Sequence, residues 1–123
     1  MEKILAFQMN ETDLSILERI AGQLNIRLDI IDKADFKQTV ENLVTNNKIA
    51  SIEKYDGTGT YESMILMCDL SDKKMDKLLL SIRKNQLKIG FKAILTPTNR
   101  KWNVLKLYLE MERERNAFIK KGL

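Results

Sequence analysis

A polar corner near the end of the chain carries residue types that could bind an anion. Thr96, Thr98 and Asn99 surround the chain's only proline, and Arg100 and Lys101 follow directly in the sequence. Their hydroxyl, amide, guanidinium and ammonium groups all donate hydrogen bonds, as a phosphate or carboxylate ligand requires. A structural interpretation is also open: the proline ends a strand, and Asn99 or Thr98 caps the helix that follows.

Cations at two predicted helix starts are the second feature that could do chemistry. Lys73 and Lys74 lie in the first turn of a helix predicted over 72–86, and Arg100 and Lys101 would open a helix predicted from about residue 100. The macrodipole is positive at a helix start, so each cation there costs about 0.3–1 kcal/mol. Parallel strands that end at one edge of a sheet would bring both helix starts together. Either the four cations simply extend into water, or a phosphate, carboxylate or nucleotide binds at this edge. The residues expected to hold it are Thr96, Thr98, Asn99, Arg100, Lys101, Lys73 and Lys74.

The chain's single cysteine and its lack of histidine limit the chemistry further. Cys68 lies just before the helix predicted over 72–86. A thiol near a helix start can be reactive, whereas many free cysteines are small buried hydrophobic residues; both interpretations stay open. The chain has no histidine, which excludes Ser–His and Cys–His pairs and imidazole metal sites. We expect no metal and no cofactor, and we assign no catalytic residue; an enzyme here would depend on carboxylate, lysine or tyrosine groups.

The charges are divided unequally along the chain. Residues 1–70 carry 7 Lys and Arg against 12 Asp and Glu, and residues 71–123 carry 14 against 5, so charges of −5 and +9 sum to the net +4. Such asymmetry indicates a partner surface, self-association or an anionic ligand, or else only an uneven solvated surface. No apolar run has the roughly 18 residues that a membrane span needs. With no secretory signal and a single cysteine, we expect a cytoplasmic protein without a membrane partner.

Hydrophobic periodicity predicts strands and helices in strict alternation. Strands are predicted over 3–8, 26–31, 64–69 and 91–95. Helices are predicted over 11–24, 36–45, 72–86 and from about residue 100 to 121. The residues expected to cap these helices at their N-termini are Asn10, Asp35, Ser71 and Asn99.

The sequence also contains a weak internal repeat. Residues 4–17 align with residues 65–78 at an offset of 61, so that the apolar positions of strand and helix coincide. Further along, Val40, Leu43 and Val44 align with Val104, Leu107 and Tyr108. We interpret the chain as one domain over 1–123, built from a duplicated βαβα unit, with repeats over 1–45 and 64–123 and a polar linker over 46–63.

The pattern of each strand predicts its place in an α/β fold. The first and third strands are almost entirely apolar, which is typical of central strands, and the second and fourth alternate like edge strands. This favours a four-stranded sheet of order 2-1-3-4 with helices on both faces. A ferredoxin-like α+β arrangement, which also has the first and third strands in the middle, is the alternative. The relative direction of the two halves is open.

The last helix predicts a contact beyond the sheet. A helix of about 20 residues is about 30 Å long, which exceeds what a small sheet can cover. We expect a homodimer through this C-terminal helix, with a mobile tail as the alternative. Nucleic acid is not favoured as a partner, because the helices mix both signs of charge and no basic–aromatic strand pattern is present.

The second half resembles a known family. The stretch "KAILTPTNRKW" at 92–102, the strand with Cys68 before "LSD", and the charged final helix are similar to a family of short bacterial domains of unknown function, number thirty-seven eighty-three. The resemblance covers about residues 64–114 and implies no activity. The sequence therefore predicts a non-catalytic binding or regulatory module with an anion-binding edge. The alternatives are an enzyme acting on a phosphorylated or carboxylated small molecule and a weak nucleic-acid-binding domain.

Overall fold

The computed structural model describes residues 2–121, with side chains described for residues 2–119. The chain forms two compact units. We call Met1–Asp32 with Glu62–Leu95 the sheet unit, and Lys33–Tyr61 with Thr96–Leu123 the helical unit. Each is described by itself, and the single domain over 1–123 stays a prediction. No helix within the described residues is both long enough and apolar enough to cross a membrane.

The sheet unit contains the four predicted strands in the predicted order. Its elements are β1 (Lys3–Phe7), α1 (Glu11–Gln23), β2 (Arg27–Ile31), β3 (Met64–Cys68), α3 (Asp72–Lys84) and β4 (Phe91–Ile94). The order β2-β1-β3-β4 is confirmed. Strand β1 is parallel to β2, β3 is parallel to β4, and the two central strands run antiparallel. Because β1 and β2 are direct neighbours, the ferredoxin-like alternative, which splits this pair, is excluded.

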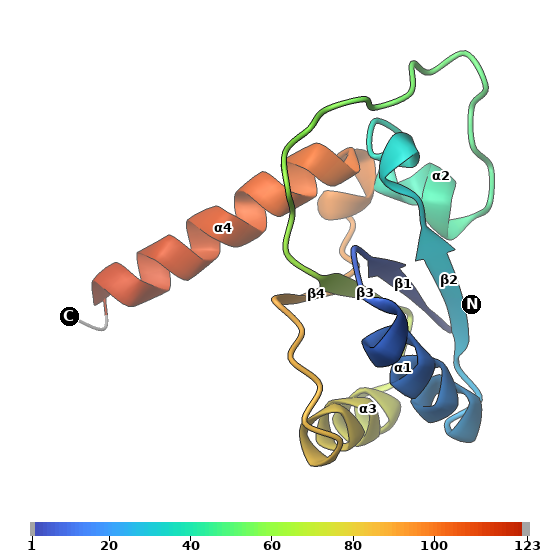
Figure 1. The fold of residues 1–123 in the computed structure, drawn as a ribbon, viewed down its shortest axis with the longest axis vertical. Coiled ribbons are helices and arrows are strands. Elements are labelled where there is room, and N and C mark those ends of the chain that lie inside the picture. Colours follow the sequence, from blue (N-terminus) through green and yellow to red (C-terminus); the bar gives the residue numbers. More distant parts are fainter. Residues whose placement is uncertain (1, 122–123) are drawn as a thin grey trace. The chain divides into compact units, whose positions relative to one another are not determined.

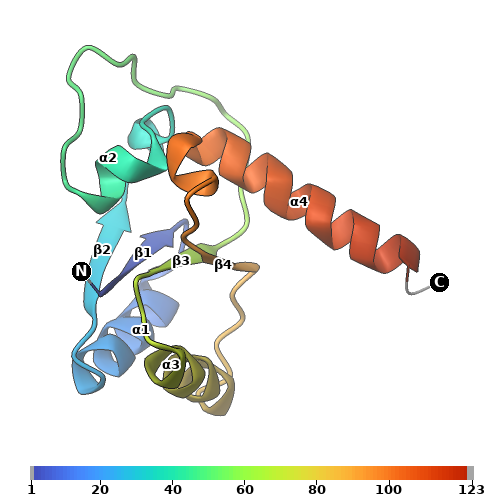
Figure 2. The same cartoon turned by 180° about the vertical axis from the view of Figure 1, so that it is seen from behind.

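Helices α1 and α3 lie side by side on one face of this sheet (Figure 1 and Figure 2). Alternate residues of a strand point to opposite faces of the sheet. In the central strands, Ile4 and Ala6 of β1 and Ile65 and Met67 of β3 point toward the helices. These residues pack with apolar side chains of both helices into one core. Its most buried members are Ile4, Ala6, Leu17, Ile20, Ala21, Ile65, Met67, Leu78 and Ile82. Helices on the second face stay a prediction.

The duplication is visible in the backbone of the sheet unit. Helices α1 and α3 each have 13 residues and begin 61 residues apart, and Asn10 and Ser71 cap them as predicted. Left-handed residues, which are uncommon outside glycine, recur at the same offset: Asn25 (φ 56°) corresponds to Gln86 (φ 55°). The repeated residues Leu5 and Leu66 are register partners at the centre of the β1–β3 pair. The βαβα repeat is therefore confirmed, and its two halves are related by a pseudo-two-fold axis near this pair.

The helical unit corrects two predicted helix starts. It contains the 3₁₀ turns η1 (Lys33–Asp35) and η2 (Asn99–Lys101) and the helices α2 (Val40–Val44) and α4 (Val104–Lys121). The helix predicted over 36–45 begins only at Val40, where Thr39 caps it. The last helix begins at Val104 and not near residue 100, and its cap is Asn103, whose Oδ1 accepts from the Lys106 N–H at 2.9 Å. Asp35 and Asn99 were therefore wrong as caps of these helices.

A pair of extended segments explains why both helices begin late. The Val40 N–H donates to the Trp102 carbonyl at 2.8 Å, and the Val104 N–H donates to the Phe36 carbonyl at 3.1 Å. Thr39 and Asn103 form an antiparallel bridge between them. This pairing holds Trp102 in an extended conformation (ψ 156°), which no helix can include. Beyond it, the predicted repeat positions Val40, Leu43, Val104, Leu107 and Tyr108 are all buried.

Candidate ligand-binding site

The Pro97 corner uses its polar groups on itself. Thr96 Oγ1 accepts from the Asn99 N–H at 3.0 Å, and Asn99 Oδ1 accepts from the Thr96 N–H at 2.8 Å. Asn99 is only 7% exposed, and Thr98 makes no side-chain cap. Since the side chains that were predicted to bind a ligand close this turn, the structural interpretation accounts for the corner.

Two of the four predicted cations are engaged in ion pairs. Arg100 Nη1 lies 2.9 Å from Glu41 Oε2 in the helical unit, and Lys74 Nζ lies 2.7 Å from Glu2 Oε1 in the sheet unit. Lys73 and Lys101 are exposed. Arg100 and Lys101 belong to η2 and so precede the first turn of α4. The two sets of cations lie in different units, so one anion site built from both stays a prediction.

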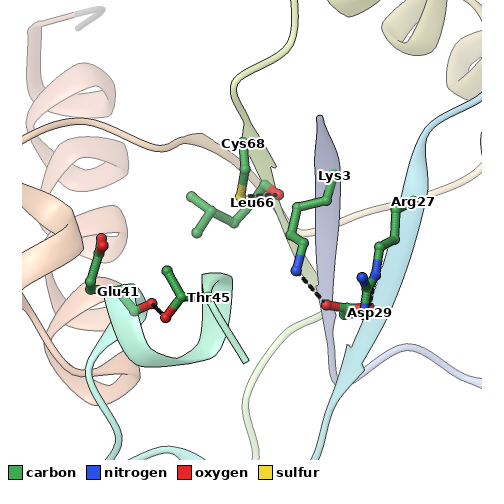
Figure 3. Close-up of polar contacts among 7 residues, drawn as sticks. All are labelled: Lys3, Arg27, Asp29, Glu41, Thr45, Leu66 and Cys68. Carbon is green, nitrogen blue, oxygen red and sulfur yellow. Dashed lines mark hydrogen bonds and ion pairs between the residues drawn. The ribbon is translucent and has the colours of Figure 1, made fainter. Parts of the chain in front are cut away.

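Cys68 is fully buried in β3 (Figure 3). Its Sγ donates to the Leu66 carbonyl at 3.6 Å. A buried thiol is inert because neither solvent nor reagents reach it and its thiolate is not stabilised. The position therefore supports the interpretation of Cys68 as a core residue.

An ion pair with a fully buried lysine lies at the other side of β1, and the sequence did not point to it (Figure 3). Lys3 is 0% exposed, and its Nζ lies 2.7 Å from Asp29 Oδ2; Arg27 Nε lies 3.0 Å from Asp29 Oδ1. Burial raises the pKa of Asp29, but the hydrogen bonds and charges of Lys3 and Arg27 outweigh it and hold the pKa below its usual value. The sequence signal was Lys3 at the start of an apolar strand and Asp29 within a strand that alternates apolar and polar residues.

A second carboxylate fastens the polar linker to the helical unit. Asp35 is buried, and its two carboxylate oxygens lie 3.1 Å and 3.2 Å from the ammonium groups of Lys48 and Lys54. Burial raises the pKa of Asp35, but the hydrogen bonds and charges of the two lysines lower it below its usual value overall. Gln38 adds hydrogen bonds to both backbone groups of Ile49. The linker is thus tied to the body of this unit at several points.

The end of the linker joins an aromatic cluster. Tyr55 and Tyr61 share a hydrogen bond between their hydroxyl groups at 3.0 Å, and both rings contact Phe36. Lys33 Nζ lies 5.9 Å and 5.8 Å from the centres of the two tyrosine rings. The hydrogen bond from Tyr55 and burial raise the pKa of Tyr61 to about 12. The cluster thus packs the end of the linker against Phe36 of the helical unit.

A groove in the sheet unit combines an apolar surface with positive charge. Its volume is about 350 Å³, and it is lined by Leu79, Ile82, Arg83, Leu87 and Lys92. Helix α3 supplies the first three residues, the connection after it supplies Leu87, and β4 supplies Lys92. This volume lies at the lower end of the range for small-molecule sites, which is roughly 300–1,000 Å³.

All five residues that line the groove belong to the second half of the sheet unit. After α1 only Leu24 to Ile26 separate helix and strand, whereas Asn85 to Gly90 separate α3 from β4; the repeat offset thereby rises from 61 to 64. The longer connection includes Leu87, which lines the groove. Leu87 and its counterpart Ile26 both belong to the core of the sheet unit, so the difference lies in the three residues inserted between Leu87 and β4. The longer connection is thus a difference in sequence between the half that carries the groove and the other half.

The charge of the groove is not balanced by nearby acids in the sequence. Between residues 77 and 109 the chain has eight Lys and Arg and no Asp or Glu. Among residues 2–119, neither Arg83 nor Lys92 is an ion-pair partner. Both side chains are exposed at the groove. An anion with an apolar body would therefore find both of its parts complemented there.

One family model matches part of the chain. Residues 63–118 match the model of a family described as a domain of unknown function, DUF3783. No curated protein and no solved structure matches the chain. The resemblance seen in the second half of the sequence is confirmed. The matched region contains α3, β4 and every residue that lines the groove.

Proposed function

We propose that this chain, which carries the DUF3783 domain over residues 63–118, is a non-catalytic binding module for a small amphipathic anion. The observation that carries the proposal is the groove: an apolar floor of Leu79, Ile82 and Leu87, with Arg83 and Lys92 among its lining residues. The ligand class is a molecule with an apolar body and one carboxylate or phosphate group. Its apolar part is removed from water at the floor, and its charge interacts with the two cations.

The titratable groups support binding rather than catalysis. A general acid or base works best with a pKa near the ambient pH. In this structure the pKa values of Asp29 and Asp35 are lowered and that of Tyr61 is raised to about 12, so all three move away from neutrality. Each of these groups is engaged in an internal hydrogen bond or ion pair. They act as structural supports, and the groove needs no proton transfer to bind an anion.

The proposal relocates the anion-binding edge that the sequence suggested. Thr96 and Asn99 bond to each other, and Arg100 pairs with Glu41. A ligand at that corner would have to compete with existing bonds, whereas Arg83 and Lys92 have no carboxylate to give up within residues 2–119. The proposed module acts in the cytoplasm.

A matched ligand series tests the proposal. Octanoate, octyl phosphate and the neutral octanol share one apolar chain and differ only in the head group. We expect the two anions to shift the amide NMR signals of residues 79–92 and octanol to bind at least tenfold more weakly. Arg83→Gln and Lys92→Gln should each weaken anion binding roughly tenfold, because a charged hydrogen bond is lost. The ratio of octanoate to octyl phosphate affinity identifies the preferred head group.

The control for this series is Lys84→Gln. Lys84 is an exposed cation adjacent to Arg83 on α3 but does not line the groove. Its loss removes the same charge from the protein and should leave the affinity within twofold. Equal binding of octanol and octanoate, equal losses in all three variants, or shifts outside residues 79–92 would each reject the proposed site.

A further inference from the structure

The last turns of α4 extend from the rest of the helical unit as an exposed arm (Figure 1). Every residue from Glu112 to Ile119 is exposed, including Phe118 at 78% and Ile119 at 53%. Most residues that expose their side chains in this arm are polar or charged, so two adjacent large hydrophobic residues near its end are unusual. We call residues 111–119 the arm.

The arm continues the apolar face of the buried part of the helix. Val104, Leu107 and Tyr108 are buried within the protein, and Met111 is half-buried on the same face. Side chains seven residues apart lie on one face after nearly two turns of an α-helix. Phe118 follows Met111 by seven residues, so it extends this face beyond the body of the unit.

Two opposite charges lie between these apolar positions. Glu114 and Arg115 flank the line from Met111 to Phe118, three and four residues after Met111. Glu110 and Arg113 pair with each other at 2.9 Å on another side of the helix. Along this face the residues are therefore apolar, acidic, basic and apolar in order. Two copies placed in opposite directions bring each acidic residue opposite a basic one.

We propose that the arm docks against the arm of a second copy of this chain in an antiparallel pair. A two-fold axis between residues 114 and 115 sets Met111 opposite the partner's Phe118. The same axis sets Glu114 opposite the partner's Arg115, and each contact occurs twice. A parallel pair would instead place Glu114 on Glu114 and Arg115 on Arg115, and like charges in contact are destabilising. The charge pattern thus selects the antiparallel orientation.

The contact area predicts a weak dimer. The symmetric overlap of the two arms spans residues 111–118, about 12 Å of each helix. Two helices of this length bury less than the roughly 800 Å² per partner of a standard interface. We therefore expect dissociation constants in the micromolar range or above, so that the state of the chain responds to its concentration. This inference is independent of the proposed groove.

Sedimentation equilibrium of the full chain tests the docking. Phe118→Asp should give a monomer at every concentration, because it places a charge at both apolar ends of the contact. Asn116→Asp adds the same charge to the same arm but on the opposite side of the helix, and it should dimerise like the original chain. Far-UV circular dichroism of both variants checks that α4 remains helical.

A charge exchange tests the orientation. Glu114→Arg and Arg115→Glu alone should each weaken the dimer at least fivefold, since each creates two like-charge contacts. Glu114→Arg combined with Arg115→Glu restores opposite charges in the antiparallel pair and should recover the original affinity. The proposal would be overturned if the chain were monomeric at millimolar concentration, or if Asn116→Asp weakened the dimer as much as Phe118→Asp. It would also be overturned if the double variant dimerised no more tightly than the single variants. Preferential binding of the arm to phospholipid vesicles would likewise overturn it.

Discussion

The β1–α1–β2 and β3–α3–β4 halves of the sheet unit can be compared residue by residue, because their helices, caps and left-handed residues recur at one offset. The halves match at positions that build the common core. Leu17 and Leu78, for example, are both fully buried equivalents in the common core. The differences are concentrated elsewhere, in side chains that the shared backbone does not require.

One difference concerns the face of the sheet opposite α1 and α3. The first half has the ion pair of the buried Lys3 and the half-buried Asp29, and the equivalent residues of the second half are the buried Met64 and Ala93. Both arrangements fill the same backbone positions. An ion pair and an apolar pair are thus alternative solutions at one site, as expected if the desolvation of buried charges offsets most of their attraction.

The other difference concerns the face that carries the helices. Gly22 and Leu28 of the first half correspond to Arg83 and Lys92 of the second. Leu28 packs partly against the core, whereas Lys92 is exposed in the groove. The two halves thus share a backbone but differ in the side chains at the positions that line the groove.

The largest effect expected from this comparison comes from breaking the ion pair on one side only. Asp29→Ala removes the Asp29 carboxylate from beside the fully buried Lys3 ammonium, which should cost about 4 kcal/mol of the free energy of unfolding. Adding Lys3→Met reproduces the second half's arrangement and should recover most of this loss. Urea unfolding followed by circular dichroism measures both values.

The control for this cycle is Asp76→Ala, which removes an exposed carboxylate from α3. It should change the free energy of unfolding by less than about 0.5 kcal/mol. If the Lys3→Met and Asp29→Ala double variant is no more stable than Asp29→Ala alone, the two solutions are not equivalent and the comparison fails.

The next effect concerns the shared core. Leu17→Ala and Leu78→Ala each remove a fully buried side chain from the same cluster, and each should cost about 3 kcal/mol through lost burial and a residual cavity. Equal costs are expected because the residues are equivalents about the pseudo-two-fold axis. Thermal and urea unfolding of the two variants side by side measures the difference. A cost at Leu78 less than half of that at Leu17 would mean that the groove lets the second half collapse around the cavity.

The comparison also shows which parts of the fold a sequence can predict. Element order, the sheet order and the repeat follow from local patterns of apolar residues and from matching residues such as Ile4 and Ile65. The antiparallel direction of the halves could not be predicted, because an apolar central strand has the same pattern in either direction. The start of α4 was missed because Trp102 is extended only through its bond to Val40, 62 residues away.

The candidate site, unlike the fold, was not predicted from the sequence. Sequence reasoning favoured the clustered donors of Thr96 and Asn99, which in the structure satisfy one another. In the sequence, Leu79, Ile82 and Arg83 have the pattern of an ordinary amphipathic helix. A groove forms there because other parts of the chain leave these residues uncovered, and the sequence pattern does not show this. The longer connection after α3 and the acid-free run from 77 to 109 are features of the sequence of the half that carries it.

A smaller effect is expected from acid, which should reduce the free energy of unfolding more in the original chain than in a variant without the ion pair. The lowered pKa of Asp29 means that its ion pair stabilises the fold fully above the unfolded value of 3.8, and that this contribution is lost as the pH falls through the folded value. The Lys3→Met and Asp29→Ala double variant lacks this term and should lose less stability between about pH 5 and about pH 3. Asp35, whose pKa is also lowered, is present in both proteins and supplies a common background. An equal loss of unfolding free energy in the two proteins over this pH range would contradict the prediction.

The smallest expected effect concerns the left-handed residues that close α1 and α3. Asn25 and Gln86 occupy equivalent positions at φ 56° and 55°, but asparagine tolerates this conformation better than glutamine does. Gln86→Gly should therefore stabilise the chain by about 0.5–1 kcal/mol, and Asn25→Gly by much less, because glycine relieves more strain at glutamine than at asparagine. Differential scanning calorimetry of the two variants resolves this difference as a larger rise of Tm for Gln86→Gly. The reverse ranking would show that a side-chain contact of Gln86 stabilises the chain by as much as its backbone strain destabilises it. Gln86 would then help to hold the connection between α3 and β4.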